Sequence, residues 1–189
     1  MPTADQLDQL YEDHAQVVFS FLLNLTRDEA DTHDLLQELF IKLTRQPDLM
    51  VGVRDPRAFL LRLAHNAAID LIRRRQTRER NEDRYGAERS PLFSPGDDPD
   101  EEAFRQNLES ALTKLPPDQR AVVHLKLWAG LTFAQIADAL EISPNTAASR
   151  YRYGLDKLRA RLRPLYEEIR ETPQEPTGVA GPAAPQKAK

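Results

Sequence analysis

The segment from Thr132 to Leu162 constrains this chain most, because it reads as two short helices joined by a tight turn. Thr132 followed by Gln135 forms a capping box that predicts the start of the first helix. Ser143 and Pro144 supply an N-cap and a proline at the first position of the second helix. A capped helix, a short turn and a second helix with small polar and basic residues are typical of a helix-turn-helix.

The second of these helices predicts a DNA-reading face. Its polar side chains can reach base edges and phosphates when the helix lies in a major groove. The candidate contacts are Asn145, Thr146, Ser149, Arg150 and Arg152. A helical hairpin with a solvated basic face would show a similar pattern, so this segment on its own leaves both interpretations open.

The net charge of −4 over 189 residues hides three charged regions. Residues 1–49 hold ten acidic residues against three basic ones, a net charge of −7. Residues 57–80 hold seven arginines and two acids, and residues 144–163 hold six basic residues and one acid, so each region has a net charge of +5. The two basic regions suit nucleic acid, and the acidic region suits a basic protein surface.

Three longer helices are predicted upstream, each with apolar side chains at helical spacing. Their expected starts are a capping box at Thr3 and Gln6, an N-cap at Asp28, and the pair Asp55–Pro56. No strand-like alternation persists anywhere. We therefore expect residues 3–80 to form one three-helix domain.

The remainder of the chain divides into a linker, a second domain and a tail. Residues 81–103 are rich in proline and glycine and end in an acidic run, which predicts a flexible linker. Residues 104–165 predict four short helices that end with the helix-turn-helix. Residues 166–189 predict a disordered tail. The expected fold class is all-α, with two small helical domains joined by a flexible linker.

Two of the predicted helices carry charges outside their apolar stripes. Asp31, Asp34, Gln37 and Glu38 lie on one side of the second helix and form either a solvated face or a docking surface for a partner. The third helix ends in Arg73, Arg74 and Arg75. Basic residues near a helix C-terminus complement its dipole, but there are more arginines here than that role needs. Such a cluster suits contact with the phosphates of a nucleic-acid backbone.

The sequence favours a binding protein over an enzyme. It has no cysteine, and its four histidines are scattered over different helices. Glu29 and His33 have the spacing of a metal pair, but no third ligand supports them. We expect no catalysis, metal, cofactor or small-molecule substrate. No segment has the length or composition of a membrane span or signal peptide, so we expect a cytoplasmic protein without membrane insertion.

Three ordered motifs resemble the group 4, or extracytoplasmic-function, sigma factors. Residues 31–41 resemble their D-x-x-D-L-(V/T)-Q-E-x-F helix, and residues 59–74 resemble their W-L-x-x-I-A-x-N-x-x-x-D-x-x-R-R segment. Residues 115–150 carry the L-P-x-x-x-R, G-L-x-x-x-x-I-A and T-x-x-S-R elements of their second domain. The resemblance covers roughly residues 7–165.

This resemblance implies a bacterial transcription initiation subunit without catalysis of its own. Its implied partners are core RNA polymerase, through the β′ clamp and the β flap, promoter DNA, and a possible anti-sigma factor. It implies polymerase contact by Asp31, Asp34, Gln37 and Glu38. It implies −10 contact by Asn66, Arg73 and Arg74, and −35 contact by Asn145, Thr146, Ser149, Arg150 and Arg152.

The chain departs from the family pattern at four positions. Phe59 replaces a frequent tryptophan, Asn145 a frequent glycine, and Ala148 an often basic residue. Glu141 occupies a turn position where glycine is common. A dimeric helix-turn-helix regulator that acts without polymerase is the alternative, and a helical scaffold is disfavoured by the two arginine clusters.

Overall fold

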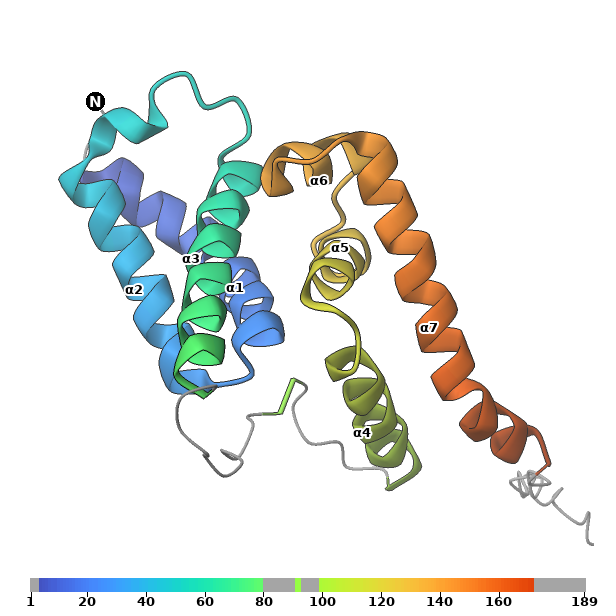
Figure 1. Cartoon of the computed structure of the whole chain (residues 1–189). Coiled ribbons are helices and arrows are strands. Elements are labelled where there is room, and N and C mark those ends of the chain that lie inside the picture. The colour runs from blue at the N-terminus through green and yellow to red at the C-terminus, as the bar shows by residue number, and fades with distance from the viewer. Residues whose placement is uncertain (1–3, 80–90, 93–98, 172–189) are drawn as a thin grey trace, which may run out of the picture.

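The computed structural model describes residues 4–79, 91–92 and 99–171, and every regular element in these ranges is a helix. The α-helices are α1 (Ala4–Thr26), α2 (Glu29–Arg45), α3 (Pro56–Glu79), α4 (Pro99–Thr113), α5 (Pro117–Leu127), α6 (Phe133–Leu140) and α7 (Pro144–Glu171). A 3-10 turn, η1 (Pro47–Met50), follows α2. Helices α1–α3 form one body and α4–α7 a second (Figure 1). The predicted all-α fold is confirmed.

Side-chain caps begin two helices of the first body where the sequence predicts them. The Asp28 carboxylate accepts a hydrogen bond from the backbone N–H of Asp31 at 2.9 Å. The Asp55 carboxylate accepts from the N–H of Ala58 at 3.0 Å, and this bond holds the pKa of Asp55 below its usual value. The predicted capping box at Thr3 lies outside the described residues.

Two helix boundaries differ from the sequence prediction. Helix α4 begins at Pro99, inside the segment expected to be linker, since a proline at the first position followed by acidic residues is a favourable helix start. Helix α7 continues past Pro164 to Glu171, six residues beyond the expected end of the second domain. The expected disorder of residues 172–189 and most of the linker fall outside the described residues.

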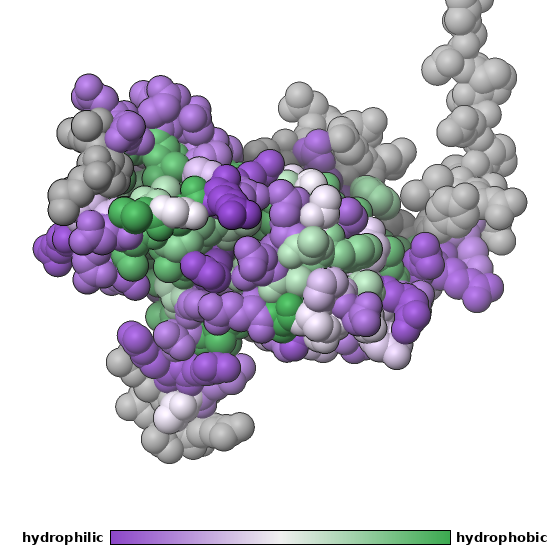
Figure 2. Space-filling view, turned by 90° about the horizontal axis from the view of Figure 1, so that it is seen from above, coloured by the Kyte–Doolittle hydropathy of each residue, from purple (hydrophilic) through white to green (hydrophobic). Residues whose placement is uncertain are grey.

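The two bodies pack against each other, which the sequence pattern does not reveal. Helix α5 lies against α1, and α6 lies against α3. The Phe21 ring of α1 is fully buried, with its centroid 5.6 Å from His124 of α5 and 6.4 Å from His65 of α3. One apolar cluster includes buried residues of both bodies. Viewed from above, the described atoms form one continuous surface (Figure 2). We call this contact between α1–α3 and α4–α7 the seam.

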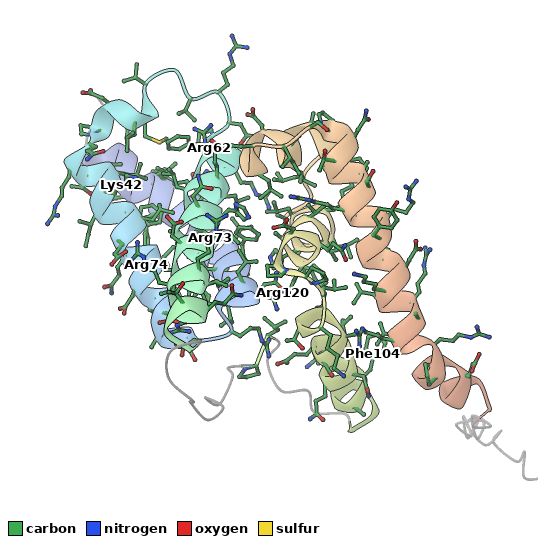
Figure 3. All side chains as sticks on the ribbon, in the orientation of Figure 1. Lys42, Arg62, Arg73, Arg74, Phe104 and Arg120 are labelled. Carbon is green, nitrogen blue, oxygen red and sulfur yellow. The ribbon has the colours of Figure 1, made fainter. Side chains whose placement is uncertain are left out.

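Hydrogen bonds and an ion pair cross the seam along its length. The buried Arg120 donates to the Leu25 carbonyl oxygen of α1 at 3.2 Å and lies between the two bodies (Figure 3). The Gln135 amide donates to the Asp55 carboxylate at 2.8 Å. Arg27 forms an ion pair with Glu109 of α4. These contacts join the bodies at separate points along the seam, which fixes the relative orientation of the bodies.

Burial at the seam lowers the pKa of His124 to about 4. The imidazole lies between the ring of Phe21 and the ring of Trp128, which directly follows α5, so its charged form is disfavoured. His65, whose ring centroid lies 6.4 Å from that of Phe21, also has a lowered pKa because of burial. Both side chains are therefore neutral in the folded protein at neutral pH.

We predict that the free energy of unfolding falls as the pH drops from about 6.5 to about 4. In this window the unfolded chain binds a proton at His124 that the folded chain does not, which costs at most about 1.4 kcal/mol per pH unit. Urea unfolding at a series of pH values measures this slope. His124→Leu should flatten it, and parallel curves for the two proteins would contradict the assignment.

Candidate nucleic-acid interface

The turn between α6 and α7 sets the geometry of the helix-turn-helix. The predicted capping box is present: the Thr132 hydroxyl accepts from the Gln135 N–H at 3.2 Å, and the Thr132 N–H donates to the Gln135 amide oxygen at 2.9 Å. The N–H of Ile142 bonds to the Ala137 carbonyl at 2.9 Å, the bond of a Schellman motif. Glu141 takes the left-handed position of this motif at φ 55°, where glycine is strain-free.

Helix α7 is seated closely on α5. Ser143 caps it as predicted, its hydroxyl accepting from the Thr146 N–H at 3.0 Å. One turn beyond Arg150, the buried Gly154 faces Val123 so closely that an added Cβ would lie 2.7 Å from the valine methyl group. The Phe133 ring of α6 meets Tyr151 edge-on at 5.6 Å. These contacts fix which side of α7 faces outward.

The outward side of α7 carries the residues predicted to contact the −35 element. Asn145 and Arg152 are exposed, and Thr146, Ser149 and Arg150 are half-buried. The Arg150 guanidinium lies 2.8 Å from the Asp118 carboxylate at the start of α5, with 30% of its side chain exposed. Arg150 is therefore oriented by an ion pair, whereas Asn145 projects into solvent.

Sequence reasoning missed Tyr153, which belongs to this outward side. Its side chain is 53% exposed, and the Arg152 guanidinium lies 5.2 Å from the ring centroid. Its spacing four residues after Ser149 places both on one helix face. Its helical spacing from Ser149, a candidate contact residue, was the sequence signal that could have identified it.

The residues predicted to contact the −10 element lie on the middle and C-terminal half of α3. Asn66, Arg73 and Arg74 are exposed, and Figure 3 shows the two arginines at successive positions of this helix. The Arg73 guanidinium is 3.9 Å from Asp70, a distance at which an exposed pair contributes little. Arg73 and Arg74 therefore remain available to phosphates.

The third arginine of the cluster has a different environment. Arg75 forms an ion pair with Asp31 of α2, and the Asp31 side chain is only 19% exposed. Burial raises the pKa of Asp31 despite the nearby guanidinium. The predicted polymerase-contact residues Asp34, Gln37 and Glu38 are exposed on α2. Asp31 thus differs from the other three predicted polymerase-contact residues, because its side chain joins α2 to α3.

His65 of α3 lies at the seam, beside Phe21. Its pKa is lowered mainly by burial, while a hydrogen bond with Asn66 and the charges of Asp118 and Arg150 in the second body have smaller effects.

The described residues contain no cluster of three or more His, Cys, Asp or Glu side chains that could hold a metal ion. The Glu29 and His33 side chains lie 3.8 Å apart on the solvent side of α2. Among the same residues, none of the helices is both long enough and apolar enough to cross a membrane.

Comparison with known proteins identifies the family. The model for sigma-70 region 2 matches residues 10–78, and the model for sigma-70 region 4 matches residues 105–158. The ECF RNA polymerase sigma factor SigL of Mycobacterium tuberculosis (strain ATCC 25618 / H37Rv) is 34% identical over 161 residues, covering 82% of this chain and 88% of SigL. The chain belongs to the ECF RNA polymerase sigma factors.

Other comparisons agree with this assignment. The ECF sigma factor SigX of Bacillus subtilis (strain 168) is 30% identical over 165 residues, covering 85% of each protein. A solved structure of the sigma factor RpoE with the anti-sigma factor NepR, from Bartonella quintana, matches with a TM-score of 0.70 at 20% identity, covering 82% of this chain and 96% of that one. This sigma factor directs RNA polymerase to promoters, and α1–α3 and α4–α7 correspond to regions 2 and 4.

We predict that Gly154→Ala destabilises region 4, because the new methyl group would collide with the buried Val123. The loss should be about 1–3 kcal/mol, even though alanine is the better helix former. Thermal unfolding of the two proteins measures it. Val123→Ala combined with Gly154→Ala should recover part of the loss, and a more stable single variant would contradict the close approach.

Proposed function

We propose that this sigma factor reads the −35 element with α7 and the −10 element with α3, while the exposed acidic face of α2 docks on core polymerase. The observation that carries the proposal is the division of charge among three helices. Exposed arginines lie on α3 and α7, and the exposed carboxylates Asp34 and Glu38 lie on α2. DNA phosphates attract the first two surfaces and repel the third.

For the −35 element, the N-terminal turns of α7 enter the major groove. Asn145 and Ser149 face base edges there, and Arg152 reaches the backbone. The backbone N–H of Thr146 donates to the Ser143 hydroxyl, which fixes the position from which the Thr146 hydroxyl contacts DNA. Arg150 acts from the flank of the helix, with Asp118 orienting its guanidinium.

For the −10 element, Arg73 and Arg74 hold the phosphate backbone and Asn66 contacts an exposed base. Unpaired strands are held by basic grooves together with polar or stacking side chains. For polymerase, Asp34, Gln37 and Glu38 form the contact surface. Asp31 supports that surface through its ion pair with Arg75 of α3. Region 4 contacts the β flap of the polymerase.

We further infer that the protein has no catalytic activity of its own and works in the cytoplasm, where RNA polymerase acts. An anti-sigma factor is a partner of the structural relative RpoE, and we propose a comparable regulator for this chain. The alternative, a dimeric regulator independent of polymerase, is not favoured because both sigma regions are present in order. Run-off transcription with core polymerase tests the proposal directly.

We predict that Arg150→Ala lowers holoenzyme affinity for −35-containing promoters by about 1–3 kcal/mol, roughly 5- to 150-fold, and relaxes preference at the contacted base. Promoter binding by reconstituted holoenzyme, with intact and scrambled −35 elements, measures both effects.

Arg159→Ala is the matched control, because Arg159 is exposed on the same helix and paired only weakly with Asp156 at 3.7 Å. It should weaken binding uniformly and lower its salt dependence. Equal effects of the two substitutions on sequence preference would contradict a base contact by Arg150.

We predict that Asp34→Arg abolishes binding to core polymerase while leaving the fold intact, since Asp34 is exposed on α2. Co-purification with core polymerase measures binding, and circular dichroism measures the fold. Asp8→Arg makes the same change of charge at an exposed position of α1 and should bind normally. Wild-type recovery of the Asp34 variant would rule out this docking surface.

A further inference from the structure

Tyr153 lies on the same side of α7 as residues proposed to contact the −35 element. An α-helix turns by about 100° per residue, so Tyr153 lies about 20° around the helix axis from Thr146 and about 40° from Ser149. The Tyr153 side chain is 53% exposed, whereas those two residues are half-buried. Among these three residues, only Tyr153 brings an aromatic ring to this side of the helix.

The direction in which Tyr153 points is fixed by residues close to it in the sequence. Tyr151 packs edge-on against Phe133 of α6, and Gly154 is buried against Val123 of α5. Helix α7 cannot rotate about its axis without breaking both contacts. The helix forms the outer edge of the second body (Figure 1). Tyr153 is therefore held on the side of α7 that faces away from α5 and α6.

The ring of Tyr153 is also held by the residue before it. The Arg152 guanidinium lies over the ring, 5.2 Å from its centroid, which is the distance of a cation–π contact. The cation covers one face of the ring and restricts its movement. A ring held in this way meets a partner with its edge or with its other face.

In a major groove, the partner that suits this ring is apolar. The bases of a duplex are stacked and present only their edges, so the Tyr153 ring cannot stack on them. Most groups on these edges are hydrogen-bond donors or acceptors, and the apolar group is the 5-methyl group of thymine. A helix with its side chains is about 10–12 Å wide and the groove is about 12 Å wide, so side chains on the inserted side reach the base edges.

We propose that Tyr153 is a further specificity-determining residue of the −35 contact: its ring packs on the 5-methyl group of a thymine, and Arg152 positions the ring. This inference rests on the proposed insertion of α7 into the major groove. Tyr153 follows Ser149 by four residues, about 6 Å of helix, and base pairs are about 3.4 Å apart. The thymine therefore lies within about two base pairs of the position that Ser149 contacts.

The test begins with a DNA probe chosen by the protein itself. Holoenzyme reconstituted from core polymerase and the full-length chain selects from a pool of duplexes whose −35 segment is randomised, and the most enriched sequence is the probe. Each thymine of this segment, on either strand, is then replaced singly by deoxyuridine. This replacement removes the methyl group and keeps every hydrogen-bonding group of the base. Competition binding measures the affinity of holoenzyme for each duplex.

For the wild-type protein, we expect deoxyuridine at one position to weaken binding about fourfold, because the burial of one methyl group is lost. Tyr153→Ala should bind the thymine probe more weakly and should not respond to deoxyuridine at that position. Tyr153→Phe keeps the ring and should retain the fourfold ratio. Ser149→Ala should relax the base preference within about two base pairs of the same position.

Tyr11→Ala is the matched control, because it removes a similarly exposed tyrosine, 49% exposed, from α1. It should keep the wild-type ratio between the thymine and deoxyuridine probes. A substitution that acts only by weakening α7 would lower the affinity for both probes and leave their ratio unchanged.

Equal ratios for the wild-type protein and Tyr153→Ala would overturn this inference, as would a selected −35 segment without thymine. Loss of the ratio in Tyr153→Phe would also overturn it, because the hydroxyl rather than the ring would then carry the effect. Each of these results leaves the proposed −35 contact of α7 in place. Absence of any base preference in the randomised segment would instead reject that contact, and the role of Tyr153 with it.

Discussion

The packing of α1 on two sides is the constraint on which the rest of this structure depends. One side of α1 meets α2 and α3, and the other meets α5 of region 4. Phe21 is fully buried at this second contact, between histidines of both bodies. An apolar stripe too wide for a three-helix bundle needs another cover, because exposed aromatic surface is unfavourable in water. Region 4 supplies that cover, and the orientation of α7 follows.

The electrostatic organisation depends on the same packing. The sequence shows one acidic region and two basic regions, but the structure divides the acidic region and the first basic region into groups that hold the fold and groups that face outward. Asp31 and Arg75 neutralise each other between α2 and α3, whereas Asp34 and Arg74 remain exposed. Arg120 lies inside the seam, although its sequence motif gives no hint of a partner in region 2. Net charge by segment therefore overstates the charge available to partners.

Local features were predictable and distant contacts were not. The caps at Asp28, Asp55 and Ser143 and the box at Thr132 follow from residue types at fixed spacing, and all are present. The family motifs predicted which helices carry the candidate site. Its detailed environment escaped prediction, because the Arg150–Asp118 pair and the exposure of Tyr153 depend on which helix faces are covered. Those faces are set by tertiary packing, which periodicity within one helix does not encode.

The side chain of Gln135 takes part in two structures at once. Its amide oxygen accepts from Thr132 within the helix-turn-helix, while its amide nitrogen donates to Asp55 across the seam. Asp55 likewise keeps one oxygen on the Ala58 N–H of its own helix. Breaking the bond between them leaves each helix start capped by its own residues. The same two side chains thus serve a local helix start and the seam at once, and neither contact is made at the expense of the other.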